Sequence, residues 1–298
     1  MRVVSLVPHA TELLFALGVG PEMVAVTHEC DYPAAALELP RVTRDVLAPG
    51  LDAAEVDAAV RERTLGGEAI YELDRAALTA LEPELIVTQA LCPVCAVSYE
   101  EVAELARGMS RRPQVIALDP KTVDETLADV GTLAEATARR ERGAALVRDA
   151  AARIERVKLA VRAAERRPRV AALEWLDPVF IAGHWTPELI ELAGGEDVLG
   201  VAGEPSSTAS WETLAAAAPE VVVAMPCGYD AARARAEAQA HRSELSRLNC
   251  RVVAVDASAY FSRPGPRLID GLELLAKVLH PQLAPEPPPG VQALTVLD

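Results

Sequence analysis

The fold is decided by a stretch that occurs twice, as Leu81-Glu82-Pro83-Glu84-Leu85-Ile86-Val87 and as Ala217-Ala218-Pro219-Glu220-Val221-Val222-Val223. In each copy a helix ends before a proline, and a run of apolar residues then predicts a buried strand. A second pair repeats in the same order, because Glu12-Leu13-Leu14 and Glu188-Leu189-Ile190 each begin six residues before a glycine. Two matches in one order indicate a duplicated lobe.

Short β-branched runs alternate with amphipathic helical stretches along the chain. This alternation is typical of a parallel sheet covered by helices on both faces. The predicted strands are Val3–Val7, Met23–Thr27, Glu84–Thr88, Gln114–Leu118, Val170–Leu173, Val221–Ala224 and Val252–Val255, and the predicted helices include Thr11–Leu17 and a last helix from about Pro266 to Leu279. The sequence therefore predicts an α/β protein with two Rossmann-like parallel-sheet lobes.

The stretch between Lys121 and Arg166 contains neither proline nor a strand-like run. It predicts one or two helices of roughly 40 residues, about 60 Å long at ~1.5 Å per residue, which suits a long interdomain helix better than a piece of one small lobe. We expect an N-terminal lobe at 1–120, the connecting helix at 121–166 and a C-terminal lobe at 167–280. The proline-rich residues 281–298 are expected to form an extended tail.

The composition excludes several classes of partner. The 298 residues are 51% apolar and 24% charged, with a formal net charge of -15. An acidic chain lacks the basic stripe that binds nucleic acid, and it is not suited to an anionic membrane surface. No apolar run reaches the ~20 residues of a membrane span. The first residues resemble no secretory signal, so a cytoplasmic location is expected, or a periplasmic or cell-surface one if the chain is trimmed.

Ligands of open α/β sheets bind beyond the carboxyl ends of the strands, so the expected site is a cleft between the two lobes that these ends line. Aromatic residues are only 4% of the chain, yet several fall in the predicted strand-end loops. Flat apolar walls with a few polar groups suit a large organic ligand. The expected ligand contacts are Pro8, His9, His28, Tyr32, Cys92, Glu174, Trp175, Trp185, Cys227, Tyr229, Tyr260 and Arg263.

Trp185 precedes Thr186-Pro187, a pair that predicts a helix start with Thr186 as the N-cap. The ring has two possible roles: it covers a flat ligand face, which we favour, or it packs near Ile190 and fixes the helix to its lobe.

A second interpretation is a metal site. His28, Cys30, Cys92 and Cys95 are donors of the kind that hold zinc, iron or an iron–sulfur cluster. An odd count of five cysteines does not indicate a disulfide framework.

A third interpretation is an enzyme in which Glu29 or Glu174 acts as a general acid or base, but neither carboxylate has an evident partner. No catalytic triad, phosphate loop or nucleotide fingerprint is visible, so the sequence does not indicate an enzyme.

Five stretches carry a family resemblance: Ser5-Leu6-Val7-Pro8-His9-Ala10-Thr11-Glu12, Thr27-His28-Glu29-Cys30-Asp31-Tyr32-Pro33, Leu91-Cys92-Pro93-Val94-Cys95-Ala96-Val97-Ser98, Leu173-Glu174-Trp175-Leu176-Asp177-Pro178 and Ser262-Arg263-Pro264-Gly265-Pro266-Arg267. With them the chain resembles the substrate-binding proteins of ABC importers for metal chelates, and in particular the cobalamin-binding branch. The resemblance covers about residues 1–280. It implies two lobes joined by a rigid helix, and cobalamin or a related corrinoid as the ligand of an importer component or intracellular carrier.

The importer-linked members of this family resemble one another in carrying a docking carboxylate on each lobe. Here Glu212 stands seven residues before Pro219, whereas Ala76 stands at the equivalent place before Pro83. Asp74 is near but out of register. The importer partner is therefore less firmly implied than the small-molecule ligand.

Overall fold

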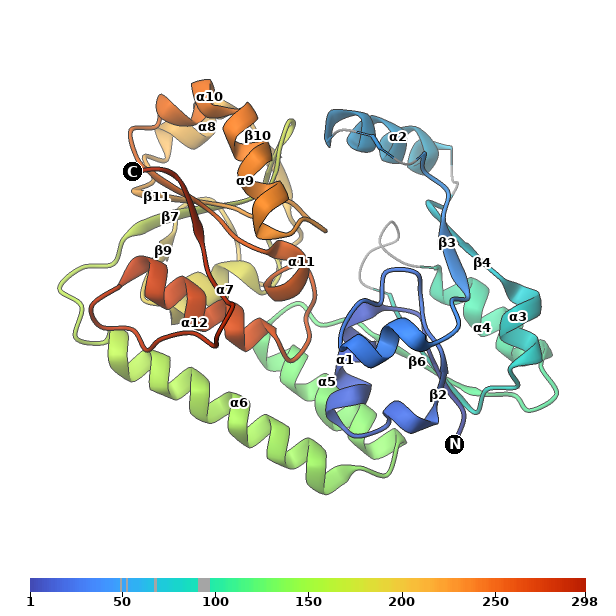
Figure 1. Ribbon diagram of the computed structural model, residues 1–298. Coiled ribbons are helices and arrows are strands. Elements are labelled where there is room, and N and C mark those ends of the chain that lie inside the picture. The colour runs from blue at the N-terminus through green and yellow to red at the C-terminus, as the bar shows by residue number, and fades with distance from the viewer. Residues whose placement is uncertain (49, 52, 67–68, 91–96) are drawn as a thin grey trace. The chain divides into compact units, whose positions relative to one another are not determined.

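The computed structural model describes residues 1–48, 50–51, 53–66, 69–90 and 97–298 (Figure 1). The chain divides into two compact units. The first, unit 1, holds Met1–Pro120 and Leu127–Leu146, and the second, unit 2, holds Lys121–Thr126 and Val147–Asp298.

Unit 1 is built on a parallel sheet whose strand order is β2-β1-β5-β6. Its core joins the sheet residues Val4 and Ile86 to Leu78 and Val102 of the covering helices. Strands β3 and β4 form a separate antiparallel pair. The elements are β1 (Val3–Ser5), α1 (Pro8–Ala16), η1 (Gly20–Glu22), β2 (Met23–Ala25), η2 (Ala34–Glu38), β3 (Thr43–Asp45), α2 (Ala53–Leu65), β4 (Tyr71–Leu73), α3 (Arg75–Ala80), β5 (Leu85–Gln89), α4 (Tyr99–Gly108) and β6 (Gln114–Leu118).

Unit 2 has a mixed sheet of order β10-β8-β7-β11-β12-β13, with β9 paired to β7. Strands β7, β11 and β12 are mutually parallel, while β8, β10 and β13 run antiparallel to their neighbours. Helices α7 and α12 lie on one face of this sheet and α8, α9 and α10 on the other (Figure 1). The elements are β7 (Arg169–Leu176), β8 (Val179–Ile181), α7 (Thr186–Leu192), β9 (Glu196–Asp197), β10 (Ser207–Ala209), α8 (Trp211–Ala216), β11 (Val221–Ala224), α9 (Ala231–Ala240), α10 (Arg242–Ser246), β12 (Arg251–Ala254), α11 (Ala257–Tyr260), α12 (Leu268–Leu279) and β13 (Leu294–Leu297).

The predicted α/β class is confirmed, although the antiparallel strands of unit 2 were not predicted. The stretch expected to connect the lobes forms two helices, α5 (Val123–Ala136) and α6 (Arg140–Val161). They are separated at Ala138, whose φ is 54°. A Cβ on Gly143 would lie 2.4 Å from the Cβ of Ala134, so the close approach of α5 and α6 requires glycine there.

The repeated stretches adopt matching geometry in the two units. Helices α3 and α8 are each followed by a residue with positive φ, 43° at Glu82 and 46° at Ala218, and then by the proline of the repeat. The helices of the other pair, α1 and α7, are each followed by a glycine with φ near 80°, Gly18 and Gly194. The repeats are thus the same local structure built twice.

Several boundaries differ from the sequence predictions, among them the three that follow. Helix α1 begins at Pro8 rather than Thr11, since proline suits the first helical turn. Thr186 is the first residue of α7 and not its N-cap, a position that Trp185 holds. The segment expected as an extended tail ends in strand β13, which pairs with β12.

A buried carboxylate fixes α6 to α12 within unit 2. The side chain of Glu273 is 3% exposed and accepts hydrogen bonds from Arg153 at 2.7 Å and from Arg156 at 2.7 Å. Asp270 also accepts from Arg153, at 2.6 Å. Burial alone raises the pKa of Glu273, but the hydrogen bonds and charges of the two arginines outweigh it and hold the pKa below its ordinary value of 4.5.

We predict that Glu273→Gln lowers the free energy of unfolding at neutral pH by about 3 kcal/mol, because it removes the buried carboxylate that pairs with both Arg153 and Arg156 and leaves Arg153 with Asp270 alone of its two carboxylate partners. A carboxylate whose pKa is lowered by folding stabilises the protein above its unfolded pKa. The difference between wild type and variant should therefore shrink as the pH falls below 4.5. Urea unfolding across pH measures this. The matched control is Glu72→Gln, which breaks the exposed Arg44–Glu72 pair and should change stability by less than about 1 kcal/mol.

Candidate ligand-binding site

The carboxyl ends of β1 and β2 place several predicted ligand contacts in unit 1. Pro8 and His9 open helix α1 and are buried, His9 with 2% of its surface exposed. Tyr32, in the loop after β2, is 47% exposed. Of these three residues, Tyr32 therefore presents its ring to solvent, while Pro8 and His9 form the layer beneath the surface.

His28 belongs to a hydrogen-bonded cluster in the same loop. Its Nδ1 lies 2.8 Å from the hydroxyl of Thr43, which also accepts the His28 backbone N–H at 3.1 Å. The ring packs against Tyr71 with 5.0 Å between centroids. The Tyr71 hydroxyl donates to Glu29 at 2.9 Å. The imidazole is therefore fixed on two sides and remains only partly buried.

Cys30, one of the four residues of the predicted metal site, is packed among hydroxyl groups. Its side chain is 1% exposed, and its sulfur lies 3.1 Å from the hydroxyls of Thr11 and Thr27. Cys92 and Cys95 lie outside the described residues. Across the part of the chain that the structure describes, no group of His, Cys, Asp and Glu side chains is arranged to hold a metal ion. The thiol thus serves the packing of α1 against the loop, and the metal-site interpretation is not favoured.

In unit 2, an aromatic pair lies at the carboxyl ends of β7 and β11. The rings of Trp175 and Tyr229 meet edge to face with 5.5 Å between centroids. The guanidinium of Arg233, at the start of α9, lies 3.7 Å from the centre of the Tyr229 ring. Tyr229 is 4% exposed, so it supports Trp175 and Arg233 from below.

Glu174 lies beside this pair and is held by a hydroxyl. The Oγ of Ser206 donates to its carboxylate at 2.5 Å and accepts the backbone N–H of Gly183 at 3.2 Å. Cys227 is exposed, and its backbone N–H donates to the carbonyl of Glu174 at 3.1 Å. The loop after β11 is therefore bonded to the end of strand β7.

The loop after β12 brings charged groups to the same edge. Asp256 caps α11 by accepting the backbone N–H of Ala259 at 2.7 Å. Burial raises the pKa of Asp256, and the charges of Arg267 and Arg263 lower it in part. Arg267 lies 5.9 Å from the centre of the Tyr260 ring. Tyr260 and Arg263 are partly buried and keep some surface for a ligand.

Trp185 is 5% exposed, and its indole N–H donates to the carbonyl of Phe261 at 2.8 Å. This bond ties the start of α7 to the residue after α11. The ring thus packs inside unit 2, and a ligand contact by Trp185 stays a prediction.

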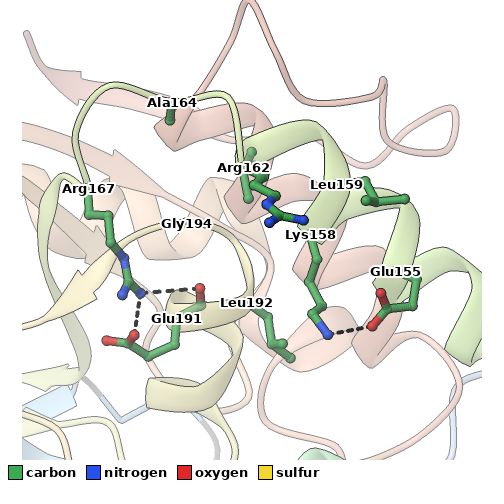
Figure 2. A pocket seen from close by; sticks show the side chains of 10 residues that line it. Glu155, Lys158, Leu159, Arg162, Ala164, Arg167, Glu191, Leu192 and Gly194 are labelled. Atoms are coloured by element: carbon green, nitrogen blue, oxygen red, sulfur yellow. Dashed lines mark hydrogen bonds and ion pairs between the residues drawn. The ribbon is translucent and has the colours of Figure 1, made fainter.

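A hollow of about 560 Å³ lies elsewhere in unit 2, where α6 and α7 end (Figure 2). Arg167 and Lys158 point into it and pair with Glu191 and Glu155 (Figure 2). Cations at the carboxyl ends of helices neutralise the helix dipole, which accounts for these side chains. None of the predicted ligand contacts lines this hollow.

The chain matches the periplasmic binding protein family over residues 3–245. It belongs to this family. As a member it is a binding protein and not an enzyme, and the predicted family resemblance is confirmed.

Relatives and solved structures agree with this assignment. A vitamin B12-binding protein of Vibrio cholerae serotype O1 is 27% identical over 285 residues, which cover 93% of this chain and 88% of that protein. The crystal structure of the periplasmic vitamin B12 binding protein BtuF of Vibrio cholerae has a TM-score of 0.66 at 25% identity, over 93% of this chain and 96% of that one. A periplasmic heme binding protein of Pseudomonas aeruginosa has a TM-score of 0.74 at 20% identity, over 98% and 97% of the chains, which shows the shared fold.

The expected cytoplasmic location is not supported, because these similar structures are of periplasmic proteins. In the described residues, no helix has both the length and the apolar character needed to cross a membrane.

The sequence did not indicate which residues fix the candidate site's side chains at the strand ends. Thr43, Tyr71 and Ser206 lie 15, 42 and 32 residues from their partners His28, Glu29 and Glu174, in loops or strands without a motif. Arg233 had a local signal, since it follows Tyr229 at the helical spacing of four residues.

We predict that Trp185→Ala lowers the free energy of unfolding of the ligand-free protein by about 3–5 kcal/mol, the usual cost of truncating a buried aromatic side chain. Trp185→Phe keeps most of the side-chain volume and loses the hydrogen bond to Phe261. The lost bond should lower the free energy of unfolding by about 1 kcal/mol, in addition to a packing loss smaller than that of Trp185→Ala. Chemical unfolding without ligand measures both. An unchanged stability in Trp185→Ala would place the ring outside the packed interior.

Proposed function

We propose that this family member binds vitamin B12 or a related corrinoid and presents it to an ABC importer. The likeness to a vitamin B12-binding protein over 93% of the chain carries the proposal. The proposed contacts are the predicted residues that keep accessible surface, namely Tyr32 and His28 of unit 1 and Glu174, Trp175, Cys227, Tyr260 and Arg263 of unit 2. The expected position of the ligand in a cleft stays a prediction.

The chemistry of these residues suits a large ring with a polar rim. Tyr32 and Trp175 supply flat apolar surface, and Arg263 and His28 supply hydrogen-bond donors. A corrinoid combines a flat macrocycle with peripheral amides, and a heme combines one with carboxylates. Heme is the second candidate, because a heme-binding protein in complex with two hemes is 25% identical over 95% of this chain.

We predict that the ligand-free protein binds cyanocobalamin in the micromolar range or tighter, and more tightly than hemin. Tyr32→Ala should weaken binding by about 1–2 kcal/mol through the lost ring contact, without a change in melting temperature. Isothermal titration calorimetry with both ligands measures this. The control is Leu159→Ala. Leu159 is an apolar residue on α6 that is 64% exposed, and its substitution should leave binding unchanged. Binding of neither ligand by the wild type would refute the proposed function.

Transfer to an importer is proposed to use Glu212. This residue lies exposed in the first turn of α8, and a hydrogen bond from Ser210 lowers its pKa, so it is ionised at neutral pH. The matching helix of unit 1, α3, carries the exposed Ala76 at the equivalent place. A docking surface with one carboxylate is expected to bind a basic partner surface less tightly than one with two.

We predict that Glu212→Lys lowers ligand import into proteoliposomes holding the cognate importer by at least about tenfold, since a like charge then faces the basic surface. Cyanocobalamin affinity should stay unchanged. Glu244→Lys is the matched control, because Glu244 keeps part of its surface in solvent and is likewise bonded to a serine hydroxyl, that of Ser243 at 2.6 Å. Ala76→Glu should raise import. Equal import by the Glu212→Lys and Glu244→Lys variants would exclude Glu212 from docking.

A further inference from the structure

The bonds of His28 determine which of its ring nitrogens carries the proton. The Oγ1 of Thr43 has one hydrogen to donate and two lone pairs to accept with. One lone pair accepts the backbone N–H of His28 at 3.1 Å, because an amide N–H can only donate. The other contact of this oxygen, in the part of the chain that the structure describes, is the His28 Nδ1 at 2.8 Å.

Thr43 is 7% exposed, and leaving the hydrogen of a buried hydroxyl without an acceptor is unfavourable. If Nδ1 carried a proton, the Thr43 oxygen would accept twice and its own hydrogen would have no acceptor among the described residues. If Nδ1 carries no proton, the hydroxyl donates to it, and the Thr43 hydroxyl, the His28 backbone N–H and Nδ1 are all satisfied. The neutral imidazole is therefore the tautomer with the proton on Nε2.

The ring is also fixed in orientation. Tyr71 packs against it at 5.0 Å between centroids and 58° between planes, and the hydroxyl of Tyr71 is itself bonded to Glu29. No partner of Nε2 occurs among the described residues, and the side chain keeps part of its surface in solvent. A fixed donor thus lies in the loop at the carboxyl end of β2, on the edge where ligands of α/β sheets bind.

We infer that His28 donates a hydrogen bond from Nε2 to a carbonyl or carboxylate oxygen on the rim of the bound ligand, and that it does not ligate the ligand's metal. This inference rests on the proposed function. A nitrogen that ligates a metal must be unprotonated. An unprotonated Nε2 would place the proton on Nδ1, and the hydroxyl hydrogen of Thr43 would then have no acceptor among the described residues. Thr43 is accordingly a positioning residue that fixes the tautomer.

The tautomer is tested without ligand. Two-dimensional ¹H–¹⁵N spectra of the histidine rings, recorded at about pH 8.5 so that imidazoles are neutral, distinguish the two tautomers by their nitrogen shifts. The His28 signals are identified as those missing from His28→Gln. We expect the Nε2–H pattern in the wild type and a mixture of tautomers in Thr43→Val, which keeps the shape and loses the hydroxyl. An Nδ1–H pattern in the wild type overturns the inference.

The donor role is tested with cyanocobalamin and with hemin. His28→Phe removes both nitrogens and should weaken binding about tenfold, the scale of one hydrogen bond. His28→Gln carries an amide N–H near the Nε2 position and should bind within about threefold of the wild type. His241→Phe is the matched control, since His241 also stacks on an aromatic ring, that of Trp211 at 6.1 Å, and should bind as the wild type does.

Visible absorbance spectra of the complexes show whether His28 ligates the metal of the bound ligand. Band positions of the aquocobalamin and hemin complexes should be the same in the wild type and in His28→Phe, and a shift of the bands would show that the histidine ligates the metal and overturn the inference. Equal affinity of His28→Phe and the wild type would also overturn it, with the proposed function intact. Failure of the wild type to bind either ligand would instead overturn the proposed function, while the tautomer result stands. Melting curves of each variant confirm that it is folded.

Discussion

The structure depends on how neighbouring parallel strands are held together where they begin. In unit 1 the carboxylate of Glu84, just before β5, accepts the backbone N–H of Arg2, just before β1, at 2.7 Å. In unit 2 Glu220, just before β11, accepts the backbone N–H of Arg169 at 3.0 Å. The carbonyls of Arg2 and Arg169 accept in return, each at 2.8 Å from Glu84 N and Glu220 N. Because parallel strands begin at one edge, these bonds help to set the register of β1 with β5 and of β7 with β11, and the loops that follow these four strands lie at the opposite edge.

At that opposite edge, side chains divide into those that face solvent and those that fix them. Tyr229, Thr43 and Trp185 are buried, and each contacts a neighbouring loop or a more accessible side chain. Residues held in this way lose little freedom when a ligand binds, so more of the contact energy appears as affinity. If the proposed site is correct, the buried layer contributes to binding through stability, and its substitution should first be visible in unfolding experiments.

Much of the fold was predictable because its signals are local. The proline and the positive-φ residue that end α3 and α8 lie within a few residues of the strands they precede, and the apolar runs of β5 and β11 are buried on both faces. The antiparallel strands β8 and β13 were missed, since Val179–Ile181 is short and Leu294–Leu297 follows a proline-rich segment. The strand-end positions of the candidate site followed from topology. The exposure of each side chain did not, because burial of Trp185 or Tyr229 depends on residues far away in the sequence.

The cysteine and histidine of unit 1 show why donor atoms close in sequence are weak evidence for a metal site. The Cys30 thiol is buried, and a thiolate there would have to form away from water. Two threonine hydroxyls already contact its sulfur, and Thr43 already contacts the Nδ1 of His28. A metal would have to displace these bonds and gain at most a partial set of ligands from the described residues. A chelate brings its metal already coordinated, so a protein that binds one needs flat surfaces and hydrogen-bond donors at fixed places rather than a set of free metal ligands.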